Sequence, residues 1–257
     1  METLVKELKT IKPRKPILLA GFPGLGYIGK ITVGYMVKQL KAEKLAELYS
    51  PFFPHHVITN SQGSARLPRA EFYFWKNPTE DKDLIFLTTD AQAQTVEGQY
   101  EVVDSFLDYV KEMGVETVVT IGGYSSKVED GNSKVVCVST SKKLLDEVLK
   151  AGAEMSPTGN PIVGLAGLTL GLAKFKGIDA ICVLGETPGH IPDPAVSKNV
   201  LRVVQRFLEV DLDLEPLDKE IEKMVKVLKK MEDVQQRMDD YMKKSLELES
   251  RKLTYIT

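Results

Sequence analysis

The apolar positions in the first half of the chain follow the periods of alternating strands and helices. Short apolar runs predict buried strands, and apolar residues three and four positions apart predict helices. Strands are predicted at 16–20, 83–88 and 117–121, and helices at 27–40 and 95–113. Residues 45–75, which are interrupted by prolines, are predicted to be irregular until they end in the aromatic strand 71–75. This βαβ rhythm indicates an α/β protein.

The second half of the core continues the alternation. After a polar turn at 129–132, strands are predicted at 134–139 and 178–184 and helices at 141–149, 164–175 and 194–208. Glycines in the helix at 164–175 recur at helical spacing, which favours a helix packed closely on a sheet over a second phosphate loop. A loop, GETPGHIPDP, follows the last strand at 185–194. The fold class predicted is α/β, with a mixed, largely parallel sheet flanked by helices.

The pattern changes after Glu215 to that of one long amphipathic helix. Apolar residues alternate at spacings of four and three without an intervening glycine or proline, which is typical of a coiled-coil seam. The seam residues are Leu217, Ile221, Met224, Leu228, Met231, Met238 and Met242, with the polar Gln235 and Ser245 at two further positions. The apolar face is wider than a two-stranded seam requires, so the helix packs either on its own domain or on other chains. Methionines suit an adaptable interface between chains.

These patterns divide the chain into three segments. We predict an α/β core domain at 1–215, a C-terminal amphipathic helix at 216–250 and a tail at 251–257 that becomes ordered on binding. An apolar face as long as that of the helix marks an interface, which indicates a homo-oligomer.

Composition and charge exclude several kinds of partner. The net charge of −2 provides no basic footprint for nucleic acid or an acidic membrane surface. No apolar stretch reaches the ~18 residues of a membrane span, and the first residues lack the features of a signal peptide, so we expect a cytoplasmic protein. Cys137 and Cys182 lie in β-branched runs, which indicates buried thiols instead of a disulfide or a metal site.

The stretch GFPGLGYIG, residues 21–29, raises the question of a dinucleotide site. Gly24, Gly26 and Gly29 follow a predicted strand and open a predicted helix, which is the setting of a pyrophosphate loop. The fingerprint also needs an acidic residue at the end of a second strand, and the segment that contains Glu43 and Glu47 is a poor second strand of that unit. The sequence therefore favours a tight strand-to-helix turn over nucleotide binding.

Candidate catalytic groups are few. Glu186, His190 and Asp193 form an imaginable acid/base set in the 185–194 loop, but no nucleophile accompanies the histidine. The prolines of this loop suit a rigid connector that begins the next helix. His55 and His56 lack further metal ligands at useful spacing. We therefore expect no catalytic, cofactor or metal site.

Four motifs occur together in one order. They are GFPGLGYIG after the first strand, IGGY at 121–124, GLAGLTLGLA in the 164–175 helix, and GETPGHIPDP before the last core helix. In this order the chain resembles the proteasome assembly chaperone family, in its archaeal branch, over about residues 14–210. The resemblance implies an α/β fold like that of nucleoside phosphorylases and hydrolases, used without the enzymatic site.

The resemblance also implies a function. The expected activity is that of a non-enzymatic, ATP-independent assembly chaperone or scaffold that oligomerises and docks on the α-subunit ring of the 20S proteasome. Docking relatives use a C-terminus that ends in a hydrophobic residue, tyrosine and any residue. In this chain the tyrosine is third from last, and the candidate docking tail is Leu253, Tyr255, Ile256 and Thr257.

Two alternatives stay open at this point. The first is that the helix and tail serve oligomerisation or bind a small helical protein in place of the proteasome. The second is that the chain is a nucleoside-processing or nucleotide-binding enzyme that uses the Gly24–Gly29 and Gly185–Pro194 loops.

Overall fold

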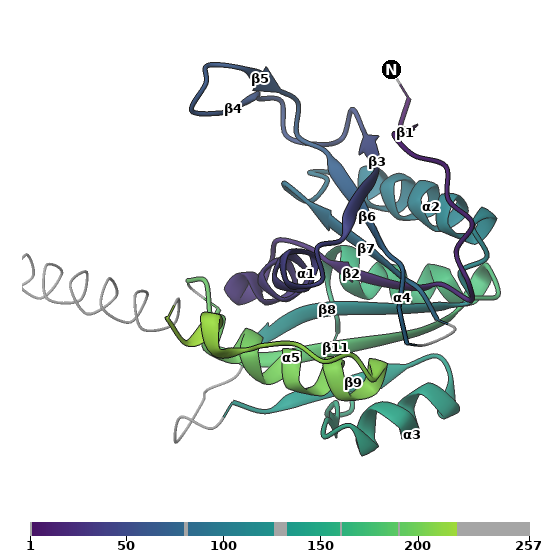
Figure 1. The fold of residues 1–257 in the computed structure, drawn as a ribbon, viewed down its shortest axis with the longest axis vertical. Helices are drawn as coiled ribbons and strands as arrows, with labels where there is room; N and C mark the ends of the chain where they lie inside the picture. Colours follow the sequence, from purple (N-terminus) through teal and green to yellow (C-terminus); the bar gives the residue numbers. More distant parts are fainter. Residues whose placement is uncertain (1, 80–81, 126–132, 160, 190, 220–257) are drawn as a thin grey trace, which may run out of the picture. The chain divides into compact units, whose positions relative to one another are not determined.

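The computed structural model describes residues 2–79, 82–125, 133–159, 161–189 and 191–219 (Figure 1). The chain divides into two units, Met1–Asp213 and Leu214–Thr257. Within the second unit, residues 215–219 are helical and Leu217 is buried. The rest of the predicted C-terminal helix, the whole tail and the predicted turn at 129–132 lie outside the described residues.

A mixed sheet runs through the first unit in the order β1-β3-β6-β7-β2-β8-β11-β9-β10. Its strands are β1 (Leu4–Glu7), β2 (Ile17–Gly21), β3 (Glu43–Tyr49), β6 (Ala70–Trp75), β7 (Leu84–Thr89), β8 (Thr117–Ser125), β9 (Val135–Ser139), β10 (Glu154–Met155) and β11 (Asp179–Thr187). The central strands β7, β2, β8 and β11 are mutually parallel. β6 and β9 pair antiparallel with the outermost two of them. The predicted mixed α/β sheet with a parallel centre is confirmed.

Helices cover both faces of this sheet (Figure 1). One face carries α1 (Ile28–Gln39), α3 (Lys142–Lys150) and α5 (Pro194–Leu208), and the other carries α2 (Val96–Glu112) and α4 (Gly164–Phe175). A short hairpin of β4 (Ile58–Thr59) and β5 (Ala65–Arg66) projects from the sheet. A large apolar cluster lies between the sheet and the α2/α4 layer, where Phe72, Phe106 and Leu165 are fully buried.

The helix starts follow from capping residues that the sequence displays. The Thr95 hydroxyl accepts a hydrogen bond from the backbone N–H of Gly98 at 3.0 Å, so α2 begins at Val96. The Asp193 carboxylate accepts one from the backbone N–H of Val196 at 3.0 Å, and Pro194 occupies the first turn of α5. α5 has the bounds that the sequence predicts.

Residues 43–49 correct the expectation of an irregular segment, because they form β3. β3 lies antiparallel between β1 and β6, and Glu47 stands opposite Glu71 in the register. Lys44 and Arg69 bind the Glu47 carboxylate with N···O distances of 2.6 and 2.8 Å. A buried carboxylate interrupts the apolar pattern from which a strand is predicted. Burying its charge costs free energy, and the ion pairs with Lys44 and Arg69 offset that cost. The N-terminal strand β1 was also not expected.

The predicted loop at 185–194 is shorter than the sequence indicates. β11 continues through Thr187, because Gly185, Glu186 and Thr187 pair with Gly123, Tyr124 and Ser125 of β8. The strand predicted at 117–121 extends to Ser125 for the same reason. Pairing between two long parallel strands thus carries both chain segments past the ends of their apolar runs.

Candidate functional site

The glycine motif after β2 forms a turn with left-handed backbone. Leu25–Tyr27 make a single 3-10 turn in which Gly26 has φ +59°, and Tyr27, the residue before α1, has φ +52°. Such values are costly for a residue other than glycine and persist only where the surroundings impose them. The surrounding chain therefore holds this turn in a fixed conformation. The turn lies at the carboxyl end of β2, the edge at which α/β sheets commonly bind ligands.

The glycines at this edge let separate segments of the chain approach each other closely. A Cβ atom on Gly29 would lie 2.2 Å from the carbonyl oxygen of Ile121, and one on Gly123 would lie 2.5 Å from that of Leu25. A Cβ on Gly26 would meet the Thr187 side chain at 3.1 Å. The first two distances leave room only for hydrogen, so Gly29 and Gly123 permit a close approach between backbone segments, whereas the contact at Gly26 is tight and is made by a side chain. The motif is explained by packing between β2, β8 and β11 and their loops.

Gln92 ties two further loops into the same edge. Its side-chain nitrogen donates to the carbonyl of Pro23 at 2.5 Å, and its side-chain oxygen accepts from the backbone N–H of Leu165 at 3.0 Å. The backbone N–H of Asp193 donates to the carbonyl of Gly26 at 2.7 Å. The segments after β2, β7 and β11 and the start of α4 are thus joined. Sequence reasoning missed Gln92, whose role depends on partners far away in the chain.

The arrangement of β3 separates this loop from a dinucleotide site. In a Rossmann unit the strand that follows the first helix lies directly beside the first strand, parallel to it, and carries the acidic residue. Here that strand is β3, which pairs antiparallel with β6, and β6 and β7 stand between it and β2. The Glu47 carboxylate binds Lys44 and Arg69. The expectation of a poor second Rossmann strand agrees with this topology, although the segment is a strand.

The acidic groups of the predicted 185–194 loop have structural partners. The Asp193 carboxylate caps α5 and also accepts a hydrogen bond from the Thr187 hydroxyl at 2.9 Å. The Glu186 carboxylate accepts one from the backbone N–H of Lys134 at 3.0 Å. Burial, and secondarily the nearby Glu186 carboxylate, raise the pKa of the Tyr124 phenol. His190 lies outside the described residues, so the imagined acid/base set is not assembled by what the structure describes.

The cysteines and histidines give no sign of metal or thiol chemistry in the described ranges. Burial raises the pKa of the Cys137 thiol to about 11 and that of Cys182 to about 12, so both stay protonated near neutral pH. Among the described residues, no group of three or more His, Cys, Asp or Glu side chains is placed to hold a metal ion. In the same residues, no helix combines the length and the apolar character that crossing a membrane requires.

Apolar side chains point outward at the carboxyl edge. Leu25, Tyr27 and Ile191 are 41%, 47% and 40% exposed, and Val163 beside the start of α4 is more exposed still. Leu25 also lies against Gly189, where a Cβ would meet its side chain at 2.7 Å. Exposed apolar groups on loops held in place from behind are suited to contact another protein.

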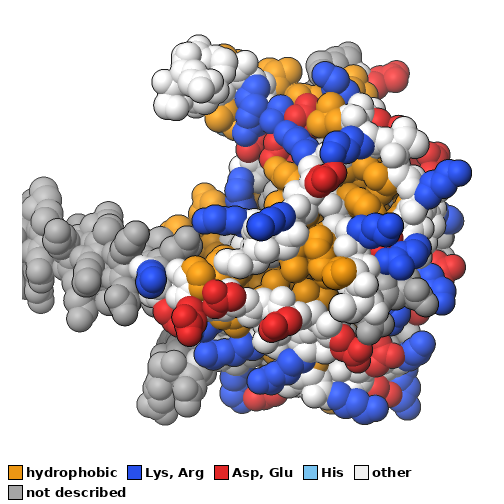
Figure 2. Space-filling model, viewed as in Figure 1, with side chains coloured by type: hydrophobic (Ala, Val, Ile, Leu, Met, Phe, Trp, Pro, Cys, Tyr) orange, Lys and Arg blue, Asp and Glu red, His pale blue; other side chains and the backbone are white. Residues whose placement is uncertain are grey.

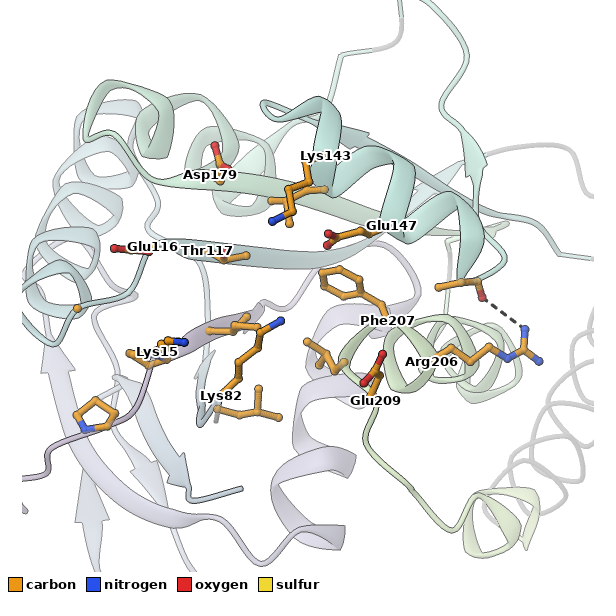
Figure 3. A pocket seen from close by; sticks show the side chains of 18 of the residues that line it. Lys15, Lys82, Glu116, Thr117, Lys143, Glu147, Asp179, Arg206, Phe207 and Glu209 are labelled. Atoms are coloured by element: carbon orange, nitrogen blue, oxygen red, sulfur yellow. Dashed lines mark hydrogen bonds between the residues drawn. The ribbon is translucent and has the colours of Figure 1, made fainter. Parts of the chain in front are cut away.

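The opposite edge of the sheet contains an open groove of about 910 Å³. It lies at the amino ends of the four central strands, between them and the C-terminal ends of α3 and α5 (Figure 3). Its floor includes Ile17, Leu84 and Leu144, which are buried, and Phe207, which is half-buried. Its charged lining residues are Lys15, Lys82, Glu116, Lys143, Glu147, Lys150, Asp179, Arg206 and Glu209. On the face drawn in Figure 2, hydrophobic side chains are likewise bordered by charges of both signs.

The predicted C-terminal sites fall almost wholly outside the described residues. Leu217 is the member of the apolar seam that the structure describes, and it is buried. Ile221, Met224, Leu228, Met231, Met238 and Met242 lie outside the described ranges, as do Leu253, Tyr255, Ile256 and Thr257. These residues stay predictions from the sequence.

Fold and edges together define a class of protein. It is a helix-flanked α/β protein whose sheet has a parallel centre and whose carboxyl edge is closed by its own glycine-bearing loops. The model of the PAC2 family matches residues 18–232, and the chain belongs to this family. The predicted resemblance to the archaeal proteasome assembly chaperones is confirmed.

Three similar proteins place the chain within this family. PbaB of Pyrococcus furiosus, an archaeal proteasome activator, is 34% identical with a TM-score of 0.85, covering 90% of this chain and 99% of PbaB. PbaA of the same organism, an archaeal homolog of proteasome-assembly chaperone, is 23% identical with a TM-score of 0.77, covering 96% and 98%, and shows the shared fold. The uncharacterized protein MJ1210 of Methanocaldococcus jannaschii is 31% identical over 220 residues, 85% of this chain and 84% of the relative.

Proposed function

We propose that this protein is a non-enzymatic, ATP-independent assembly chaperone or scaffold that acts on the α-subunit ring of the 20S proteasome as a homo-oligomer. The observation that carries the proposal is the likeness to PbaB, a proteasome activator, which extends over nearly all of that chain at 34% identity. Membership of the PAC2 family supports the same function.

The closed carboxyl edge supports a role that does not involve catalysis. Asp193 and Glu186, the acids nearest the expected ligand position, hold a helix cap and a backbone N–H. The exposed Leu25 and Tyr27 on the same edge offer contact area for a protein. A nucleoside-processing enzyme needs the reverse arrangement, with free polar groups that converge on a cavity.

Self-association is proposed from the C-terminal seam. The apolar stripe from Leu217 to Met242, interrupted at Gln235, is longer than one small core is expected to cover, and coiled-coil spacing suits identical helices packed together. The rival occupant of this face is a small helical protein, which would bind in the same way. Light scattering on the intact chain and on Met231→Glu separates the two: loss of the oligomer in the variant supports self-association, whereas a monomeric intact chain contradicts it.

The tail is proposed as the anchor on the proteasome. Leu253, Tyr255 and Ile256 supply apolar side chains and Thr257 supplies a carboxylate for a lysine in a pocket between α subunits. Because Tyr255 is third from last, its ring enters such a pocket with one residue more behind it than in docking relatives. The tail therefore needs a direct test separate from that of oligomerisation.

The decisive experiment is surface binding of the protein to assembled archaeal α rings, with and without ATP and magnesium. We compare the intact chain, Tyr255→Ala, and a form that lacks residues 253–257, with Tyr100→Ala as control because Tyr100 is an exposed tyrosine on α2. The expected result is ATP-independent binding that the control retains and both tail variants lose. Equal binding by all forms removes the tail as anchor. No binding by the intact chain overturns the proposed function.

A further inference from the structure

The charged side chains of the amino-edge groove are not paired with one another. Within the described residues, Lys15, Lys82, Lys143, Glu147 and Glu209 make no side-chain hydrogen bond or ion pair, although all five line one groove. Charges on the β3/β6 part of the sheet behave differently: Lys44 and Arg69 each contact both Glu47 and Glu71 within 3 Å. The groove therefore keeps charges of both signs available around an apolar floor.

Lysines and glutamates both direct their charges into the groove, and Lys143 and Glu147 do so from the same helix, α3. Figure 3 shows the ammonium groups of Lys82 and Lys143 directed into the open space, with Lys15 on the side of the strand ends. The carboxylates of Glu147 and Glu209 flank the Phe207 ring. Asp179 and Glu116 point away from the space, and Arg206 turns outward and donates to the carbonyl of Ala151.

The side of the groove around Phe207 has further features that favour a cation. Residues 206–209 are at the C-terminal end of α5, so the partial negative charge of that helix end lies along this side. The face of an aromatic ring such as Phe207 also attracts a cation. Lys15, Lys82 and Lys143 also line the groove, and each offers a point charge for an anion.

Backbone conformation holds two of these charged residues in unusual positions. Lys15 has φ +38° and Glu209 has φ +55°, in the left-handed region that residues other than glycine seldom adopt. One lies just before β2 and the other just after α5, on opposite sides of the groove. Glu209 adopts this conformation as the C-cap of α5, a common way for a helix to end, and the Val210 N–H donates to the Gln205 carbonyl at 3.0 Å.

We propose that the amino-edge groove is a docking site for an extended peptide segment of a partner protein that carries a basic and an acidic side chain. The basic group lies over Phe207 between Glu147 and Glu209, the acidic group meets Lys15, Lys82 and Lys143, and the apolar residues between them cover the floor. A phosphate-bearing ligand is disfavoured, because the Glu147 and Glu209 carboxylates of the same groove would repel it. The site is independent of the tail and the C-terminal seam, so it stands or falls separately from the proposed function.

The test is fluorescence polarisation of the full chain with fluorescein-labelled peptides. The probes have the pattern Arg-apolar-Glu with one, two or three leucines between the charges, together with Gln-for-Arg, Gln-for-Glu and doubly neutral versions. We expect at least one Arg-Leu-Glu probe to bind about tenfold more tightly than its neutral version, and raised salt to weaken it.

Groove variants locate the binding. Lys82→Glu and the double variant Glu147→Gln/Glu209→Gln are each expected to weaken the best probe about five- to tenfold, and the double variant also to reduce the preference for Arg over Gln. Phe207→Leu keeps an apolar residue and is expected to weaken only probes with Arg. Lys38→Glu and Glu97→Gln, exposed residues of α1 and α2, serve as matched controls and leave binding unchanged.

Three outcomes overturn the proposal. The first is that no probe binds. The second is that neutral or singly charged probes bind as tightly as the amphoteric ones. The third is that the groove variants bind like the intact chain, which places the peptide elsewhere. A variant that loses its cooperative unfolding transition is replaced by Lys143→Gln, a milder change in the same groove.

Discussion

The two edges of the central sheet are built in opposite ways. At the carboxyl edge, glycines let backbone segments approach closely, and Gln92 and Asp193 tie the loops together with hydrogen bonds. At the amino edge, the strand ends leave a groove of about 910 Å³ with unpaired charges around an apolar floor. In the described residues, the loops at the edge that α/β proteins commonly use for ligands pack on one another, whereas the opposite edge holds an open groove.

This difference shows why a shared fold does not transfer a site. A glycine-rich turn after the first strand, in the right place of the right fold, has the outline of a dinucleotide loop. Its glycines are required by contacts such as that of Gly29 with the Ile121 carbonyl. A motif is therefore judged by what its residues touch, and function is argued from those contacts.

The largest effect is expected from filling the closed edge. Gly29→Ala places a Cβ 2.2 Å from a backbone oxygen that cannot move without disturbing β8, so we expect the free energy of unfolding to fall by about 2–4 kcal/mol. Urea denaturation measures this. Gly34→Ala is the control in the same helix, because a Cβ there has nothing within 4 Å, and it is expected to stabilise the protein by about 0.5–1 kcal/mol. Equal stability of both variants would refute close packing at this edge.

The next largest loss of stability is expected from removing the charge of Asp83, a buried carboxylate near the amino edge of the sheet. Burial alone would raise the pKa of Asp83, but hydrogen bonds from the Arg14 side chain and from the backbone N–H groups of Arg14 and Asn77 outweigh it and hold the pKa below 3.8. Asp83→Asn is expected to cost about 1.5–3 kcal/mol at pH 7.

The pH dependence gives this prediction a second readout. Because the folded pKa lies below the unfolded value, the stabilisation by Asp83 is complete above about pH 4 and is lost as the pH falls through the folded pKa. The difference in unfolding free energy between the intact chain and Asp83→Asn should be constant from pH 7 to 5 and shrink toward pH 3. A difference that grows on acidification would contradict the assigned hydrogen bonds.

A smaller effect is expected where the closed edge depends on a helix cap. Asp193→Ala removes the acceptor for the Val196 N–H and the partner of the Thr187 hydroxyl, at an expected cost of about 1–2 kcal/mol. Asp193→Asn retains a capping oxygen and should cost less than half as much. Thermal unfolding of the two variants provides the comparison, and equal losses would show that the cap is not the role of this side chain.

Charge reversal at the open edge is expected to leave stability almost unchanged. Lys82 and Lys143 are exposed and unpaired in the described structure, so Lys82→Glu and Lys143→Glu should each shift the unfolding free energy by no more than about 0.5 kcal/mol. A loss of 2 kcal/mol in either variant would mean that the groove is structural.

The last prediction is that nucleotides do not change the thermal stability of the protein. Dinucleotides and ATP should not raise the melting temperature, because the carboxyl edge is closed by the chain itself. Saturating ligand at 100 times its dissociation constant would add ~2.7 kcal/mol, which thermal shift detects readily. A saturable shift with NAD, NADP, FAD or ATP would reopen the enzyme alternative.

The sequence by itself determined most of the regular elements and the family. Elements such as α4 and α5 were predicted with their bounds, because apolar period and capping residues are local signals that need few distant partners. The order of four motifs indicated the proteasome assembly chaperones, and this resemblance is confirmed. That the glycine turn binds no dinucleotide stays a prediction.

Tertiary structure decided what depends on residues far apart in the chain. β3 was missed because the buried Glu47 interrupts its apolar pattern, and the Arg69 side chain that binds this carboxylate comes from a distant part of the chain. The extension of β11 to Thr187 follows from its ladder with β8, and the role of Gln92 from loops about 70 residues away on either side. The amino-edge groove has the same origin, since its walls come from four strand starts and two helix ends. The spacing of apolar residues in the sequence shows only which side of a helix or strand is buried. The shape of a groove depends on how separate helices and strands are arranged in space.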